Sequence, residues 1–251
     1  MGNQISVNLH SYAKADPAPF EHLAAVGVRW VEIPAPLPEQ VDSALAALER
    51  HGLGASTLSC PCDLTRDPES MRPYLEAAQA FGVSKYFIST RAGDLPKPEA
   101  YRRLRVRAEL AAEFGVTLCL ETHPDLGENA SEARATLLAV SHPNLRWNLD
   151  TANLYYYNAG LDAVGQARAG KDLIGAVHLK DTNGATRCWW FPALGDGVVD
   201  FAGVFRELNS AGFHGPFALE LEGIQGEEAT AELCRARVEK SLQHLRALGV
   251  A

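Results

Sequence analysis

Short apolar runs alternate with longer amphipathic segments along the whole chain. A short apolar run bounded by turn residues is typical of a buried strand, whereas apolar residues three or four apart are typical of a helix. This pattern predicts eight strands, at residues 5–9, 29–33, 54–58, 85–89, 117–121, 146–150, 175–179 and 217–221. It also predicts helices between them, the clearest at residues 39–51, 68–81, 98–114, 131–140, 201–211 and 227–248.

Glycines mark the ends of several predicted helices, namely Gly27, Gly82, Gly115 and Gly212. Glycine ends a helix because it adopts the left-handed conformation at little cost. Strands that alternate with helices pair in parallel, and eight such units close into a barrel. The sequence therefore predicts an α/β fold, a single (β/α)8 TIM barrel over residues 1–251. An open doubly wound sheet is the alternative, but residues 10–14 lack the glycine-rich turn that such sheets carry after their first strand.

Length, charge and cysteine content narrow the class of protein. The 251 residues suit one barrel domain, and the net charge of −8 without a broad basic cluster argues against a nucleic-acid partner. No apolar run is long enough to span a membrane, so no membrane association is expected. The five cysteines, an odd number, do not suggest a disulfide framework, and the N-terminus lacks the pattern of a signal peptide. We therefore expect a cytoplasmic protein.

Four potential metal ligands stand at or near the ends of four consecutive predicted strands: Glu121, Asp150, His178 and Glu220. Active sites of barrels lie at the C-terminal ends of the strands, so these side chains are expected to meet at one rim. Three carboxylates gathered there would repel one another, and a divalent cation relieves that repulsion. Mixed carboxylate and imidazole ligands suit Mn, Mg, Co, Zn or Fe(II).

Each of these residues also has a simpler interpretation when taken alone. Asp150 is a good cap for a following helix, a glutamate at a strand end is often an ion-pair partner, and a histidine in an apolar strand often belongs to the core. Only their joint occurrence favours a metal site. In the last strand either Glu220 or Glu222 could be the ligand. We favour Glu220, because Glu222 adjoins Gly223 and already lies toward the loop.

The two-residue period of a strand adds candidates for substrate binding. His123, Lys180 and Glu222 each follow a potential ligand by two positions and so point to the same side. Asn153 lies one helical turn beyond Asp150, where it either binds a substrate hydroxyl or caps the helix.

Further candidates come from the first two strands and from aromatic segments. His10 follows the first strand, and Glu32 lies inside the apolar second strand, where an acid needs a partner. Glu32 therefore has a role in the site or in a structural ion pair. Trp190 belongs to an aromatic loop after strand seven and either covers the site or packs in the core. At least one tyrosine of residues 155–157 is expected to face the barrel.

Several motifs make the chain resemble the sugar phosphate isomerase/epimerase family of xylose isomerase-like TIM barrels, which also resembles the endonuclease IV barrel. They are Leu120-Glu121-Thr122-His123, Leu149-Asp150-Thr151-Ala152-Asn153, Val177-His178-Leu179-Lys180-Asp181, Leu194-Gly195-Asp196-Gly197 and Leu219-Glu220-Leu221-Glu222. The resemblance implies that Glu121, Asp150, His178 and Glu220 bind one divalent ion (Mn, Mg, Co or Zn).

Three departures from the resemblance bear on function. Many ketose epimerases of the family carry histidine where this chain has Asn153, and they place an arginine sooner after the histidine of strand seven than Arg187 lies after His178. The additional histidine and aspartate ligands of the three-zinc phosphodiesterase branch are not found.

The resulting hypothesis is a metal-dependent isomerase or epimerase of a small sugar or polyol. Glu121 and Glu220 would face the substrate carbon from opposite sides, and one would remove an α-proton while the other returns it through a metal-stabilised enediolate. A dehydratase or lyase acting on an inosose or keto-glycoside is the alternative, with His123 or Lys180 as the acid. A non-catalytic binding barrel is a third possibility. The sequence leaves open the sugar, its phosphorylation, the native metal and whether the chain forms a homo-oligomer.

Overall fold

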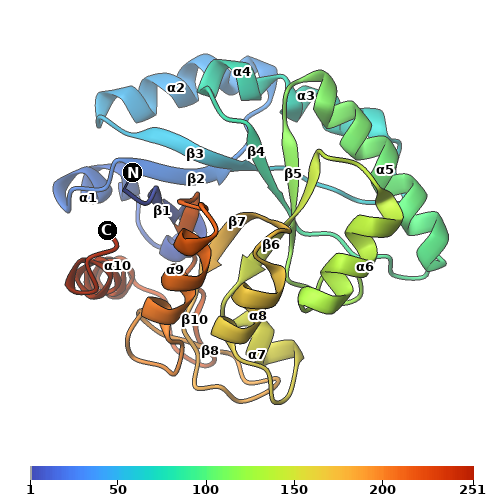
Figure 1. The fold of residues 1–251 in the computed structure, drawn as a ribbon. Coiled ribbons are helices and arrows are strands. Elements are labelled where there is room, and N and C mark those ends of the chain that lie inside the picture. The colour runs from blue at the N-terminus through green and yellow to red at the C-terminus, as the bar shows by residue number, and fades with distance from the viewer. Residues whose placement is uncertain (1) are drawn as a thin grey trace.

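Eight parallel strands form a closed barrel in the computed structural model, which describes residues 2–251 (Figure 1). In order around the barrel they are β1 (Ile5–Asn8), β2 (Trp30–Pro34), β3 (Gly54–Ser59), β4 (Lys85–Ile88), β5 (Thr117–Glu121), β6 (Leu145–Asp150), β7 (Ile174–Leu179) and β9 (Phe217–Leu219). The last strand, β9, pairs with both β7 and β1 and so closes the barrel. The predicted (β/α)8 architecture is confirmed.

Helices cover the outside of the barrel, and the two chain ends lie near each other (Figure 1). The α-helices are α1 (Pro19–Ala25), α2 (Val41–Arg50), α3 (Arg72–Leu75), α4 (Ala77–Phe81), α5 (Lys97–Glu113), α6 (Ala130–Val140), α7 (Asn153–Tyr157), α8 (Ala163–Gly170), α9 (Phe201–Ser210) and α10 (Ala231–Ala247). Short 3-10 turns occur at Leu9–Tyr12, Pro38–Gln40 and Pro68–Met71.

The structure corrects the sequence prediction in a few places. The single helix expected at residues 68–81 is a 3-10 turn followed by α3 and α4, because Pro73 cannot continue a helix and instead lies in the first turn of α3. Helix α10 begins at Ala231 rather than at residue 227. The Thr230 hydroxyl caps this start because it accepts the backbone N–H of Leu233. The last barrel strand ends at Leu219. A two-stranded antiparallel sheet of β8 (Trp190–Phe191) and β10 (Gly223–Ile224), not predicted, lies outside the barrel.

Alternation along the strands separates the apolar core from the polar barrel interior. Trp147 and Leu149 on β6 are fully buried, and Trp147 packs beside Gly170 of α8. The residues between them on the same strand, Asn148 and Asp150, face the other side and are equally buried. The inner side of the barrel therefore holds buried polar groups, and Asp150 at its rim belongs to the site described below.

Gly170→Ala is expected to destabilise the protein, although alanine normally stabilises a helix by up to about 1 kcal/mol over glycine. A Cβ at this position would lie 2.6 Å from the ring of Trp147, and overpacking of this kind costs about 1–3 kcal/mol. Urea denaturation should therefore show a net loss. Pairing the change with Trp147→Phe should make Gly170→Ala less costly, and equal costs in both backgrounds would contradict the contact as the cause.

Candidate metal centre and substrate cavity

Glu121, Asp150, His178 and Glu220 meet at the C-terminal rim of the barrel. Each offers one ligand atom, and these four atoms all lie within 4.8 Å of one another. All four residues are buried, with at most 4% of their surface exposed. Glu220, rather than Glu222, is the residue of the last strand that joins this cluster.

Asp150 has two roles that the sequence presented as alternatives. Its Oδ1 accepts the backbone N–H groups of Ala152 and Asn153, both at 2.9 Å, and so caps the first turn of α7. Its Oδ2 is buried without a hydrogen-bond partner. This oxygen meets the Lys180 ammonium as an ion pair but without a hydrogen bond, and a cation among the four ligands would coordinate it. The donor set thus fits a divalent metal ion.

The Lys180 ammonium is the main positive charge beside these carboxylates. Its Nζ lies 2.9 Å from Asp150 Oδ2, in a geometry that makes no hydrogen bond, and 2.7 Å from both Glu220 Oε2 and Glu222 Oε2. Burial alone would lower the pKa of Lys180, but these carboxylates hold it well above its ordinary value. Lys180, which the sequence predicts to bind substrate, is 1% exposed and balances the charge of the cluster.

Glu32 lies beneath His178 and fixes its orientation. Its Oε1 is 2.9 Å from His178 Nε2, while His178 Nδ1 is 3.1 Å from Glu220 Oε2. Asn8 and Thr57 donate hydrogen bonds to the Glu32 carboxylate. Burial acts to lower the pKa of His178, but Glu220 and Glu32 outweigh it and raise the pKa well above the ordinary value. With Nε2–H directed at Glu32, a cation bound at Nδ1 would take the place of the proton that Nδ1 directs at Glu220. Of the two interpretations of Glu32, the contacts match a structural partner.

A cavity of about 210 Å³ opens directly above the cluster. Four residues expected to bind substrate line it, together with the two glutamates: His10, His123, Asn153 and Glu222, with Glu121 and Glu220. His123 Nδ1 lies 2.6 Å from Glu121 Oε2, and Asn153 Nδ2 donates at 3.5 Å to Glu121 Oε1. Glu121 is thus held by two groups that themselves face the cavity.

Glu222 is the second carboxylate of the last strand that faces the cavity. Burial raises the pKa of Glu222, an effect that Lys180 opposes and Glu220 reinforces.

Aromatic rings form one wall of the cavity. Trp189, and not the expected Trp190, lines it together with Phe87, Tyr156 and Tyr157. Alternation along β8 explains the difference, because Trp189 and Phe191 share one side and their rings lie 5.0 Å apart. Arg187 stacks over both tyrosine rings, at 5.6 and 5.2 Å. The expectation that a tyrosine of residues 155–157 faces the barrel is confirmed.

Asp181 organises the loop that carries this aromatic wall. Its carboxylate accepts the backbone N–H groups of Gly195, Gly197 and Val199, at 2.8, 2.9 and 3.2 Å. A Cβ on Gly197 would lie 2.2 Å from Asp181 Oδ1, so only glycine allows this approach. The sequence showed the motifs His178-Leu179-Lys180-Asp181 and Leu194-Gly195-Asp196-Gly197 but not that they bind each other.

Comparison with known proteins places this architecture in a family. The profile described as a xylose isomerase-like TIM barrel matches residues 20–248. The chain belongs to this family. It is 30% identical over 179 residues to the L-ribulose-5-phosphate 3-epimerase UlaE of Escherichia coli, a match covering 67% of this chain and 61% of UlaE. The chain thus spans less than two thirds of the length of this relative.

Solved structures show the same xylose isomerase-like fold. A xylose isomerase domain protein of Alicyclobacillus acidocaldarius superposes with a TM-score of 0.80 at 19% identity and covers 99% of both chains. The IOLI protein, described with a bound zinc atom, superposes with a TM-score of 0.73 at 18% identity and covers 98% of both chains.

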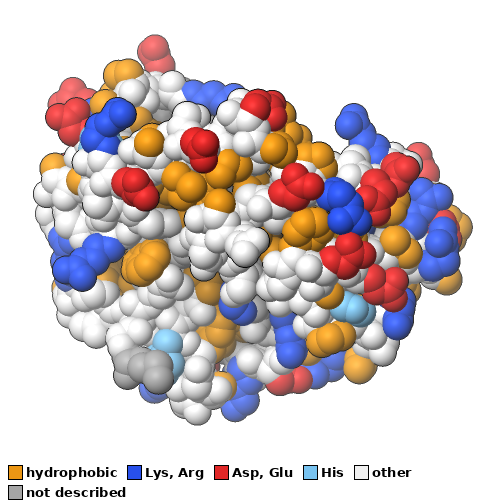
Figure 2. Space-filling model, turned by 90° about the horizontal axis from the view of Figure 1, so that it is seen from above, with side chains coloured by type: hydrophobic (Ala, Val, Ile, Leu, Met, Phe, Trp, Pro, Cys, Tyr) orange, Lys and Arg blue, Asp and Glu red, His pale blue; other side chains and the backbone are white. Residues whose placement is uncertain are grey.

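The charged surface and the helices carry no further information on the family. Figure 2 shows Lys and Arg side chains scattered among acidic ones on the face that is seen. Among residues 2–251 no helix has the length and apolar character needed to cross a membrane.

Proposed function

We propose that this protein is a divalent-metal-dependent sugar isomerase or epimerase that removes and returns a proton next to a carbonyl group. The observation that carries the proposal is the convergence of Glu121, Asp150, His178 and Glu220 beneath a cavity that Glu121 and Glu220 also line. The similarity to UlaE, an L-ribulose-5-phosphate 3-epimerase, and the zinc atom described for IOLI support it. The mixed oxygen and nitrogen ligands suit Mn, Mg, Co or Zn.

The four clustered residues would hold the ion. When bound, it supplies a Lewis acid that polarises a substrate carbonyl and makes the adjacent C–H more acidic. The crowding of negative charge supports the binding of a cation here, since Asp150, Glu220 and Glu222 all face the single ammonium of Lys180. Glu32 would keep the Nδ1 of His178 available by binding its Nε2.

The proton transfers would belong to Glu121 and Glu220. Both carboxylates reach the cavity from different strands, so a ketose lying between them presents opposite faces to the two groups. His123 and Asn153 hold Glu121 from the cavity side and are placed to contact substrate hydroxyls. His10 and Glu222 also line the cavity, and Trp189 with the tyrosines would limit the access of water to the reacting carbon.

The test is proton exchange in D2O, followed by proton NMR, with the metal-loaded protein and a panel of ketoses, ketose phosphates and inososes. Deuterium at an α-carbon together with an accumulating epimer or aldose is the expected result. Loss of a β-substituent would establish the dehydratase alternative. No exchange with any substrate, with or without metal, would overturn the proposal.

Glu32→Gln is expected to weaken metal binding by about 10- to 100-fold, because partners of a ligand histidine tune affinity by that amount. Glutamine keeps the size of the side chain and one acceptor oxygen, but it no longer offers His178 a charged acceptor, and the Thr57 hydroxyl has to turn and accept from the new amide. Titration calorimetry with Mn²⁺ or Zn²⁺ measures the change. Glu39→Gln, on the exposed surface, is the control, and equal affinities in all three proteins would exclude this role.

A further inference from the structure

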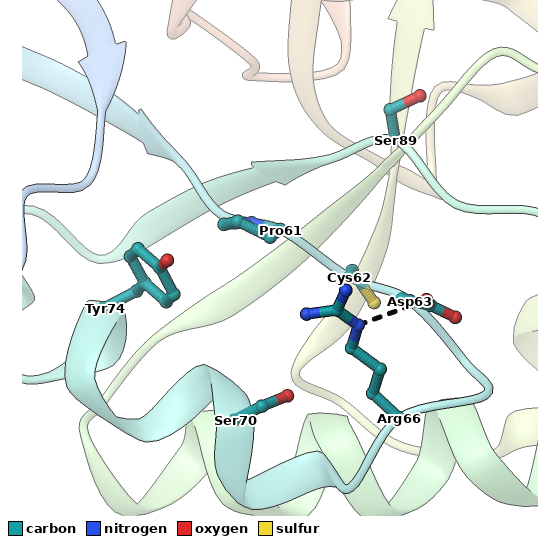
Figure 3. Close-up of a pocket in the computed structure, with 7 residues that line it drawn as sticks. All are labelled: Pro61, Cys62, Asp63, Arg66, Ser70, Tyr74 and Ser89. Carbon is teal, nitrogen blue, oxygen red and sulfur yellow. Dashed lines mark ion pairs between the residues drawn. The ribbon is translucent and has the colours of Figure 1, made fainter.

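A second hollow of about 380 Å³ (Figure 3) shares the lining residue Ser89 with the cavity above the cluster. Its lining comes from the loop after β3, from the segment of η3 and α3, and from the end of β4, namely Pro61, Cys62, Asp63, Arg66, Ser70, Tyr74 and Ser89. In Figure 3 the Arg66 side chain reaches toward Cys62 and Asp63, and the Tyr74 ring lies on another side of the same space.

Ser89 joins the two hollows, because it lines both of them. Its Oγ lies 3.0 Å from His123 Nδ1, and His123 in turn contacts Glu121. A substrate held at the metal cluster therefore extends past Ser89 into the second hollow if it carries a substituent on that side. The first cavity, at about 210 Å³, is smaller than the roughly 300–1,000 Å³ of ordinary ligand pockets, and the second hollow brings the combined space into that range.

The loop that forms the second hollow is held from beneath by two arginines of α5. Arg107, only 1% exposed, donates hydrogen bonds to the carbonyl groups of Asp63 and Arg66, at 2.7 and 2.6 Å. Arg103 donates to the carbonyl of Leu64 at 2.8 Å. Such charged hydrogen bonds fix the backbone, so the hollow has its shape before a ligand arrives.

The chemistry of the lining identifies the class of ligand. Arg66 and Asp63 form a long ion pair of 3.5 Å, and their side chains are 75% and 51% exposed. Asp63 Oδ1 already accepts the backbone N–H and the hydroxyl of Thr65, so the Arg66 guanidinium and Asp63 Oδ2 are the donor and the acceptor that face a ligand side by side. The adjacent carboxylate makes this a poor site for phosphate, whereas paired donors and acceptors match neighbouring hydroxyl groups. The ring of Tyr74 and Pro61 offer apolar faces of the kind on which a sugar ring stacks, and Ser70 adds a hydroxyl.

We propose that the second hollow binds a glycosyl group attached to the reacting sugar, so that the substrate is a keto-sugar glycoside rather than a free monosaccharide. The proposal rests on the proposed function for the placement of the reacting sugar, with its carbonyl at the metal cluster. The glycosyl ring then lies beyond Ser89, between Tyr74 and the Arg66–Asp63 pair.

The test is a binding titration of the Mn²⁺-loaded protein by calorimetry or ligand-observed NMR. The probes are D-fructose, D-fructose 6-phosphate and glycosylfructoses linked through each non-anomeric fructose hydroxyl in turn, so that every probe keeps its carbonyl group. At least one glycosylfructose should bind about tenfold more tightly than fructose. Arg66→Met should remove about tenfold of that affinity, the size expected for a lost hydrogen bond to a charged group, and leave fructose within about twofold. Arg50→Met, an exposed change elsewhere, is the matched control.

The outcomes separate this proposal from the proposed function. The subsite proposal is overturned if every glycosylfructose binds no more tightly than fructose. It is also overturned if the protein prefers fructose 6-phosphate and Arg66→Met abolishes that preference. An equal loss for all probes in Arg66→Met would also overturn it, since a distal subsite cannot affect fructose. Tighter glycoside binding without proton exchange in D2O would retain the subsite and reject the isomerase.

Discussion

Glu121→Gln is expected to slow α-proton exchange of a ketose by about a thousandfold, within the range that general acid–base groups contribute. Glutamine matches glutamate in size and still offers an oxygen to the cluster and to Asn153, but it cannot take a proton. The exchange rate in D2O, followed by proton NMR at saturating metal and substrate, measures the change.

The controls for this prediction separate loss of the base from loss of the metal. Metal content is measured in the same samples, and the comparison is made at matched occupancy because Glu121 is also expected to be a ligand. Glu228→Gln, on an exposed loop, should exchange at the wild-type rate. Wild-type exchange in metal-loaded Glu121→Gln would remove Glu121 from the proton transfers and leave that role to Glu220.

Lys180→Met is expected to lower the free energy of unfolding of the metal-free protein by about 3–5 kcal/mol, the cost of leaving buried charges without their partner. The ammonium that is lost contacts Asp150, Glu220 and Glu222, and both Asp150 and Glu220 are buried. Urea denaturation in EDTA measures the loss.

Added divalent ion should recover part of that stability, because a cation bound only by the folded state adds to stability and here also replaces the missing charge. The gain on adding Mn²⁺ should exceed the gain in the wild-type protein. Lys171→Met, at an exposed position after α8, should change stability by less than about 0.5 kcal/mol. A metal-free loss below about 1 kcal/mol for Lys180→Met would show that the carboxylates find other partners.

The residues of the metal cluster could be predicted from the local sequence pattern. Glu121, Asp150, His178 and Glu220 stand at successive strand ends, and in a parallel barrel successive strand ends share one rim, so their meeting follows from order along the chain. The roles of the residues two positions after these ligands are harder to predict. His123 and Glu222 line the cavity as alternation requires, but Lys180, on the same side as His178, is drawn inward by three carboxylates.

The positions of some residues could not be predicted from the sequence, because contacts between distant segments decide them. The choice between Trp189 and Trp190 depends on the register of β8 against β10, a pairing of two residues each that leaves almost no pattern in the sequence. Glu32 was noticed because a buried acid needs a partner, yet which partner it has is set by β2 and β7 facing each other across the barrel interior.

The sequence by itself determined the fold class, the rim at which the chemistry lies and the four residues expected to hold a metal, because strand order and two-residue alternation fix these directly. Only the tertiary structure decided which groups support them. Lys180 became the counter-charge and Glu32 the partner of His178. The second hollow exists because Arg107 of α5 binds the carbonyl groups of a loop some forty residues earlier in the chain. Such contacts join distant segments through geometry that no local pattern encodes.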